Sequence, residues 1–231
     1  MKNLATRRAG VAALALLFSG ANLGAYEVPL SPASLHEAWT LGQRNDKATA
    51  DFFLPYVQGT SEKSGDGTQI AEIEILTPFT QVVDKSRQNP SDYPEQQAQE
   101  DYHKHGDTVV LSVLLMLPAA FPKASTTPEP GSPPPSQSAT DAKPNEAIRP
   151  ENFWQNFRFV VKQRDKIIAT RAIHNNPVYS AASNDAPSVL DGAKVVLEYD
   201  AKDIASEAIT VEVVSPDAKT ILVSFDLKKL R

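Results

Sequence analysis

Asp101, His103 and His105 form the cluster in this sequence whose residue types best suit a metal ion. Imidazole and carboxylate groups are common ligands of divalent transition metals. On a β-strand, residues spaced by two share one face, so all three side chains could converge on an ion. On an α-helix, only Asp101 and His105, which are four residues apart, would pair. The surrounding sequence favours a helix. We therefore predict a solvated helix end and keep the metal site as a hypothesis.

Other catalytic patterns are missing from the sequence. There is no G-x-S-x-G elbow and no H-E-x-x-H zinc motif. Ser64 precedes Gly65-Asp66-Gly67-Thr68, which lacks the lysine of a phosphate-binding loop and reads as a plain turn. The chain has no cysteine, which excludes thiol catalysis, disulfides and thiolate metal sites. We expect a non-catalytic protein without a cofactor, and no catalytic residue is assigned.

The elements that would position Asp101 and the histidines form a helical insertion at residues 77–106. Thr77-Pro78 is typical of a helix start, and Phe79, Val82 and Val83 would be its buried face. Asn89-Pro90-Ser91 ends this helix. Ser91 could cap a polar helix through Lys104, in which Ala98 and Tyr102 face inward.

An N-terminal helical segment is predicted at residues 26–60. Ser31–Leu41 and Asp46–Val57 read as an αα-hairpin, with Ser31 as the cap of the first helix and Asn45 or Asp46 as the cap of the second. Pro55 lies within the second helix, so an extended segment over Asp51–Val57 is the alternative.

Strand patterns dominate the rest of a predicted β-sandwich domain at residues 61–231. Alternating apolar residues predict half-buried strands. The Val- and Leu-rich run at 109–117 predicts a central strand covered on both faces, with a buried helix as its rival. The seven predicted strands are Ile70–Leu76, Val109–Leu117, Phe153–Lys162, Lys166–His174, Lys194–Tyr199, Ile209–Val214 and Thr220–Leu227.

The fold class that follows is mainly β with added helices (α+β). We predict a seven-strand antiparallel sandwich that is similar to immunoglobulin and fibronectin domains and is preceded by the αα-hairpin. The antibody cysteine pair is absent. A single-sheet α+β domain is the alternative.

Residues 1–25 have the pattern of a cleaved signal peptide. Lys2, Arg7 and Arg8 precede a short apolar run and a small-residue region, with cleavage after Ala21 or Ala25. The apolar run is too short to span a bilayer. Ala9 and Gly10 after the arginine pair favour the Sec route over twin-arginine export. We therefore expect a periplasmic or extracellular protein with no membrane-spanning segment after cleavage.

Residues 118–150 form a proline-rich excursion that holds nine of the 18 prolines. Such a composition cannot build a core and predicts a disordered segment within the sandwich domain. A flexible loop is favoured over the alternative that this segment is a P-x-x-P ligand of another protein.

Net charge constrains the partners. Removing the three positive charges of residues 1–25 takes the formal net charge from −5 to −8, which argues against nucleic acid and anionic membranes. We expect an exported binding or envelope-structural protein with a protein partner in the cell envelope and an unknown oligomeric state. The alternatives are a secreted hydrolase with dispersed acids or a His-metal site, and a periplasmic assembly factor that presents an edge strand.

Overall fold

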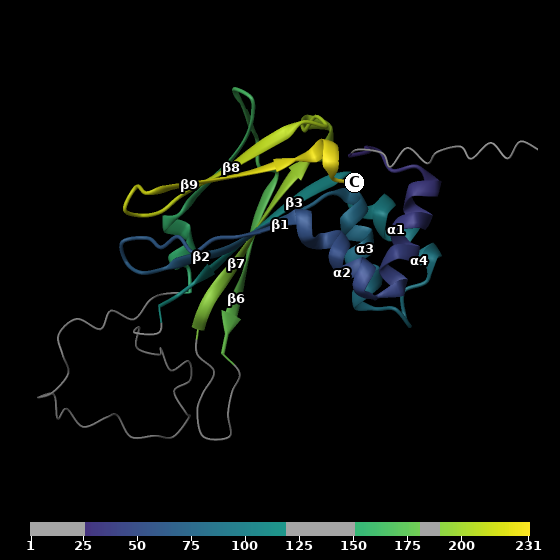
Figure 1. The fold of residues 1–231 in the computed structure, drawn as a ribbon, viewed down its shortest axis with the longest axis horizontal. Coiled ribbons are helices and arrows are strands. Elements are labelled where there is room, and N and C mark those ends of the chain that lie inside the picture. The colour runs from purple at the N-terminus through teal and green to yellow at the C-terminus, as the bar shows by residue number, and fades with distance from the viewer. Residues whose placement is uncertain (1–25, 119–150, 181–189) are drawn as a thin grey trace, which may run out of the picture.

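The computed structural model describes residues 26–118, 151–180 and 190–231. Within them the chain forms two antiparallel β-sheets and a group of helices at one end of the sheets (Figure 1). The predicted leader and the proline-rich segment, apart from Pro118, lie outside the described residues. The mainly β, α+β class is therefore confirmed.

The larger sheet has five strands in the order β1-β2-β3-β7-β6. The central strand β3 pairs antiparallel with β2 and with β7, as predicted for the run at 109–117, and the rival helix is wrong. The bounds are β1 Val57–Gly59, β2 Gln69–Leu76, β3 Thr108–Met116, β6 Ala172–Tyr179 and β7 Leu190–Asp200.

The smaller sheet has four strands in the order β5-β4-β8-β9. Its strands also pair antiparallel, and a hairpin turn that contains Pro216 connects β8 to β9. The bounds are β4 Arg158–Gln163, β5 Lys166–Ile168, β8 Ala208–Val214 and β9 Thr220–Asp226. Two sheets rather than one mean that the single-sheet alternative is wrong.

The inner faces of both sheets share one hydrophobic core. In the larger sheet, the register places Ile73, Val113 and Val195 side by side, and all three are fully buried. In the smaller sheet, Val211 lies between Val161 and Val223 in the same way. Burying each such side chain contributes about 1.5–3 kcal/mol, so packing can stabilise this cysteine-free chain.

The described residues form nine strands where seven were predicted. The predicted strand Lys166–His174 divides into β5 of the smaller sheet and the start of β6 of the larger sheet. The chain crosses between the sheets at residues 169–171, where no glycine or proline signals a break. The ninth strand, β1, is short and follows the helices. Phe153–Asn156, predicted as strand, is a 3₁₀ turn before β4.

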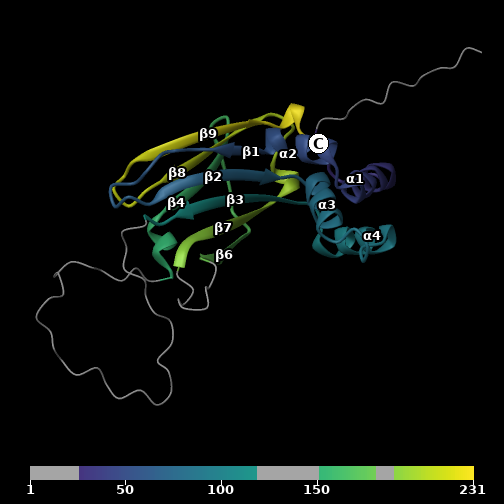
Figure 2. The same ribbon diagram turned by 60° about the horizontal axis from the view of Figure 1, so that its bottom comes forward.

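Four helices cover the end of the sandwich where β2 finishes and β3 begins (Figure 2). Ser31, Asp46 and Thr77 cap α1, α2 and α3 as predicted, each accepting a hydrogen bond from a backbone N–H three residues on. The predicted cap Ser91 is wrong, because α4 begins after Pro94. The bounds are α1 Pro32–Arg44, α2 Lys47–Phe53, α3 Pro78–Gln88 and α4 Glu95–His105.

The predicted αα-hairpin of α1 and α2 is not the main packing unit, because α1 packs chiefly on α3. A Cβ atom at Gly42 of α1 would lie 2.4 Å from the carbonyl oxygen of Val83 in α3. The Ser86 hydroxyl also donates to the Trp39 carbonyl at 3.0 Å. The helix α2 stops at Phe53, and a 3₁₀ turn that contains Pro55 follows.

Arg231 joins the helices to the sandwich. Its guanidinium pairs with Glu37 of α1 and lies 4.5 Å from the centre of the Phe79 ring in α3. Its backbone N–H donates to the Tyr56 hydroxyl at 2.8 Å. These contacts fix the helices against the end of the sheets. In the described part of the chain, no helix is both long and apolar enough to cross a membrane.

Candidate functional site

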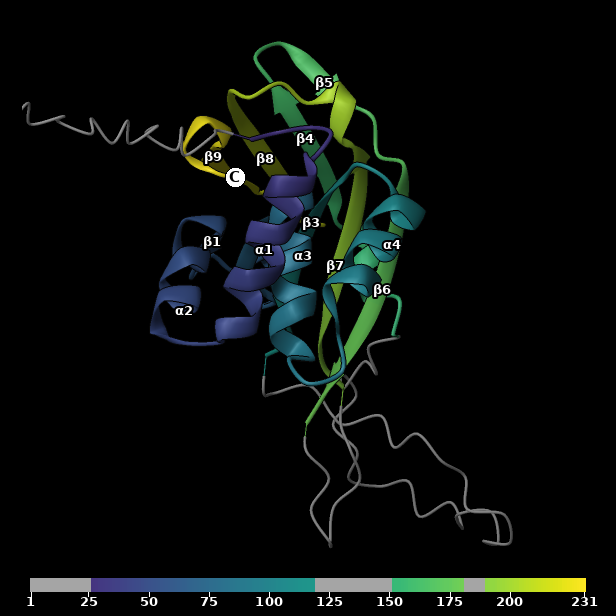
Figure 3. The same ribbon diagram turned by 90° about the vertical axis from the view of Figure 1, so that its right-hand side faces the viewer.

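A half-open cavity of about 210 Å³ lies between α3 and α4; we call it the α3–α4 pocket. Figure 3 faces the helices that enclose it. One part of the wall is apolar or aromatic and the other is polar. The apolar and aromatic lining comes from Pro78, Val82, Tyr93, Ala98 and Tyr102, and the polar lining from Gln81, Lys85, Asp101 and His105.

The pocket exists because α4 docks mainly through polar contacts. Ala98 is the one fully buried residue of this helix, so little apolar surface draws α4 against α3. The first residue of α4 and the segment before it are held instead by hydrogen bonds. The Trp39 indole N–H donates to the Tyr93 carbonyl at 2.9 Å, and His36 Nδ1 donates to Glu95 at 3.0 Å. A small side chain at position 98 therefore leaves space between the two helices.

Asp101 is the centre of the polar wall. Its carboxylate forms an ion pair with Lys85 of α3 and accepts hydrogen bonds from the Tyr93 hydroxyl at 3.1 Å and from Gln97 Nε2 at 2.9 Å. These donors favour the charged form, and the Lys85 hydrogen bond contributes most to lowering the pKa of Asp101. The carboxylate is thus fully engaged and stays ionised at neutral pH.

Tyr93 and Tyr102 form the aromatic part of the wall. Burial is the main cause that raises the pKa of both phenols, and the neighbouring carboxylates Asp101 and Asp107 raise it further. The Tyr102 hydroxyl donates to Asp107 and accepts from the backbone N–H of Leu30 at 2.8 Å. Both rings are therefore neutral and fixed in place by hydrogen bonds.

The three predicted metal ligands are only partly brought together. Asp101 and His105 both line the α3–α4 pocket, as the helical pairing predicted. His105 Nδ1, however, donates to the Asp101 backbone carbonyl at 2.8 Å rather than to its carboxylate. His103 is exposed and its ring contacts Tyr102. Across the described ranges, no three His, Cys, Asp or Glu side chains gather as metal ligands would. The metal site stays a prediction.

Sequence reasoning missed Lys85 and Tyr93. Lys85 lies on α3, sixteen residues before its partner Asp101. Tyr93 lies in the Asn89–Pro94 connection, where no periodic pattern marks a buried ring. The inward face of α4 was predicted correctly. Ala98 and Tyr102 were both expected to face inward, and both line the α3–α4 pocket.

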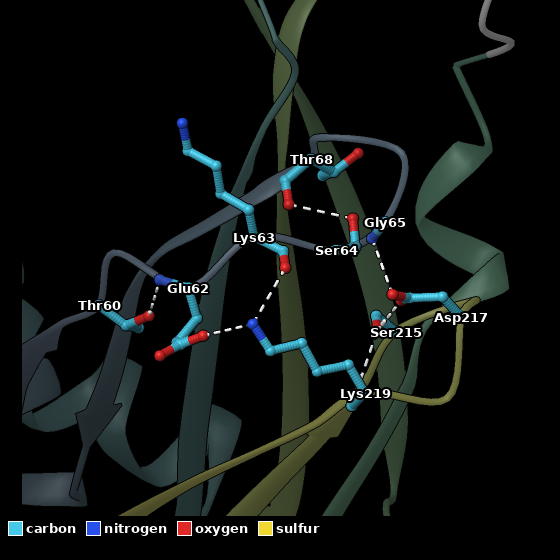
Figure 4. A network of polar contacts seen from close by, with 9 residues as sticks. All are labelled: Thr60, Glu62, Lys63, Ser64, Gly65, Thr68, Ser215, Asp217 and Lys219. Carbon is cyan, nitrogen blue, oxygen red and sulfur yellow. Dashed lines mark hydrogen bonds and ion pairs between the residues drawn. The ribbon is translucent and has the colours of Figure 1, made fainter.

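A second polar network lies at the opposite end of the sandwich; we call it the clasp. It links residues 60–68, the connection between β1 and β2, to the β8–β9 turn at residues 215–219 (Figure 4). The Gly65 N–H donates to Asp217 at 2.8 Å, and Lys219 Nζ donates to Glu62 at 2.5 Å and to the Lys63 carbonyl at 3.3 Å. The clasp therefore ties the larger sheet to the smaller one.

The hydroxyl groups of the clasp are used inside it. Ser64 donates to the Thr68 carbonyl at 3.1 Å, and Ser215 donates to Asp217. The Ser215 hydrogen bond is the main cause that lowers the pKa of Asp217, and the Gly65 N–H adds to it. Ser64 thus closes a turn, as the sequence indicated, with no histidine among the residues that contact it in the described structure.

No known family model, no characterised protein and no solved structure matches this chain.

Proposed function

We propose that this chain is an exported, non-catalytic binding protein and that the α3–α4 pocket receives an apolar side chain of a protein partner. The observation that carries the proposal is the division of the pocket wall. Val82, Ala98 and the two tyrosine rings offer apolar surface, whereas Asp101 and Lys85 already satisfy each other. Buried apolar anchors seated in pockets dominate protein interfaces.

The size of the pocket supports a side chain rather than a larger ligand. Sites for drug-sized molecules enclose about 300–1,000 Å³. The α3–α4 pocket, at about 210 Å³, is smaller. A leucine or aromatic residue at the surface of a partner would fit this volume, with the rest of the partner lying outside the pocket.

Carboxyl pKa shifts favour binding over the hydrolase alternative. A general acid in a hydrolase needs a raised pKa. Among the described carboxyl groups whose pKa departs clearly from its ordinary value, every one is lowered. They are Glu27, Asp46, Asp101, Glu212 and Asp217.

The cell envelope is the proposed setting. The leader pattern at residues 1–25 supports export, and the acidic net charge, which argues against nucleic acid and anionic membranes, supports a protein partner there. The similarity to immunoglobulin and fibronectin domains is also kept as a proposal. It rests on two antiparallel sheets over one core, an architecture that serves many unrelated functions.

Site-specific photo-crosslinking in the producing cells tests this function. A photoreactive phenylalanine analogue replaces His105 at the pocket rim, or Gln96 on the same helix as the matched control. Gln96 is exposed and does not line the pocket. We expect a discrete protein product from position 105 and none from position 96.

Ala98→Leu, combined with the analogue at position 105, shows whether the pocket itself is needed. The larger side chain narrows the pocket, so the crosslinked product should disappear, whereas Gln96→Leu should leave it unchanged. Thermal unfolding confirms that both variants are folded. Equal products from positions 96 and 105, or a product that survives Ala98→Leu in the folded protein, would refute the proposal.

A further inference from the structure

The strand β6 ends the larger sheet, and no described strand pairs with its outer edge. On the other side of the sandwich the two edge strands are tied together, because Gln58 Nε2 of β1 donates to the Ser224 carbonyl of β9 at 2.6 Å. The clasp strengthens that side. Figure 2 shows β6 at the border of the larger sheet, away from β1 and β9. Side-chain contacts therefore join the two edge strands β1 and β9, whereas the outer edge of β6 has no described strand beside it.

The side chains of β6 leave its edge unguarded by charge. Ala172–Tyr179 contains no Lys, Arg, Asp or Glu. Ile173 is 46 % exposed and Tyr179 is 41 % exposed, although both are large and apolar or aromatic. Proteins usually protect a long edge strand with charged residues, since its free N–H and C=O groups attract another strand. An uncharged edge of eight residues is suited to pairing.

Asn175 in the middle of β6 has an unmet hydrogen-bonding need. Its position aligns with Val195, so its side chain is on the inner face of the sheet. Its Oδ1 atom is buried and accepts no hydrogen bond within the described part of the chain. An unpaired buried acceptor is destabilising. If the Asn175 amide turns toward the β6 edge, a donor on a second strand can satisfy it.

We propose that β6 pairs antiparallel with β6 of a second copy of this chain, with Asn175 on the two-fold axis. Antiparallel pairing about a two-fold axis places the same surface on both partners. In this register each Asn175 lies beside the other, and each Oδ1 accepts from the Nδ2 of its counterpart. The two larger sheets then form one continuous sheet through both molecules.

The neighbouring positions fit the same register. Ile173 lies opposite Pro177 on the same face, so an exposed apolar side chain in each copy is covered by another apolar side chain. Pro177 is tolerated at an edge strand, and because it has no N–H it takes part in this pairing through its carbonyl oxygen alone. The β6 residues of one copy thus match the β6 residues of another, which favours a second copy of this chain over an unrelated strand.

The absence of cysteine makes a direct test possible. In Asn175→Cys, the two new thiols face each other across the axis. Opposed antiparallel residues have Cα atoms about 4.5–5.5 Å apart, within the range of a disulfide. Leu222→Cys on β9, which is 64 % exposed, is the matched control. We expect mild oxidation to link Asn175→Cys into dimers at least about tenfold faster than Leu222→Cys.

Light scattering coupled to size exclusion provides the second measurement. The purified wild-type protein should have the mass of a dimer. Ile173→Lys should have the mass of a monomer, because it adds charge to the β6 edge, and should still unfold in a cooperative thermal transition. Ile167→Lys on β5, 63 % exposed in the wild type, should remain dimeric. A monomeric wild type, a dimeric Ile173→Lys or equal crosslinking of the two cysteine variants would overturn the proposal. A protein that pairs β6 only with the strand of another protein would give the monomeric result.

Discussion

The α3–α4 pocket and the clasp are both polar networks, at opposite ends of the sandwich, yet only one leaves space. In the clasp, side chains meet backbone groups of the facing loop, as when Asp217 accepts from the Gly65 N–H. In the pocket, Lys85 of α3 pairs with Asp101 of α4, and α4 contributes a single fully buried residue, Ala98. Both networks bridge two segments of the chain, but the small side chain of Ala98 leaves space between α3 and α4.

The comparison implies that the pocket end depends on apolar packing beneath it, and the clasp end does not. Phe79→Ala should cause the largest loss. The Phe79 ring is 2 % exposed and packs on Phe52 and under Arg231. Removing a buried phenylalanine costs about 3–5 kcal/mol of the free energy of unfolding. Urea unfolding measures this loss. A loss below about 1 kcal/mol would contradict the dependence of the pocket end on apolar packing.

Gly42→Val should have the next largest effect. The added Cβ would lie 2.4 Å from the Val83 carbonyl oxygen, a backbone atom that cannot move aside without shifting α1 from α3. Overpacking of this kind costs about 1–3 kcal/mol. Gly59→Val in β1 is the control, because the nearest atom to its added Cβ would be 3.9 Å away. Equal destabilisation of the two variants in urea would argue against close α1–α3 packing.

Asp101→Asn and Asp217→Asn compare the two networks directly. Asp101 accepts from Lys85, Tyr93 and Gln97, so its neutralisation should cost about 1–2 kcal/mol. Asp217 is exposed, and solvent screening should make its loss smaller. Thermal unfolding should rank the variants in that order. The reverse order would mean that the clasp, rather than the pocket wall, holds the more important carboxylate.

The effect of Asp101 should depend on pH in a defined direction. Its pKa in the folded protein is lowered, mainly by Lys85. Its stabilisation is complete above the unfolded pKa of about 3.9 and is lost as the pH falls through the folded value. The stability gap between wild type and Asp101→Asn should therefore narrow below about pH 4. Urea midpoints at pH 7, 4 and 2.5 measure the gap, and a constant gap would contradict the lowered pKa.

The smallest effect is expected for Glu62→Gln in the clasp. The side chains of Glu62 and Lys219 are 54 % and 45 % exposed, and exposed ion pairs contribute about 0–1 kcal/mol. The Lys63 carbonyl still accepts from Lys219 in this variant. A loss well above 1 kcal/mol in the free energy of unfolding, measured in urea, would show that this ion pair contributes more than an exposed pair should.

Local signals made much of the fold predictable. Ser31, Asp46 and Thr77 start helices because their side chains accept the free N–H groups of the first turn. The strands β2, β8 and β9 follow from strict alternation of apolar residues. The β5–β6 division was hidden because Lys166–His174 alternates without a break, although the chain changes sheets at residues 169–171.

The pocket was less predictable than the fold. The face of α4 with Ala98 and Tyr102 could be inferred from helical spacing, and so could the pairing of Asp101 with His105. The partner of Asp101 could not, because Lys85 belongs to another helix and only tertiary packing brings the two together. The same holds for the clasp, in which Gly65 and Asp217 are 152 residues apart.

Methyl NMR during a titration with indole, a mimic of an aromatic side chain, shows whether the α3–α4 pocket binds an apolar group. Val82 and Ala98 line the α3–α4 pocket, and Ala218 lies in the β8–β9 turn of the clasp. If the pocket binds indole, we expect saturable shifts of the Val82 and Ala98 methyl signals and no shift of the Ala218 signal. In Ala98→Leu, the Val82 signal should no longer shift. Unshifted Val82 and Ala98 signals, or an equal response of Ala218, would contradict binding in the pocket.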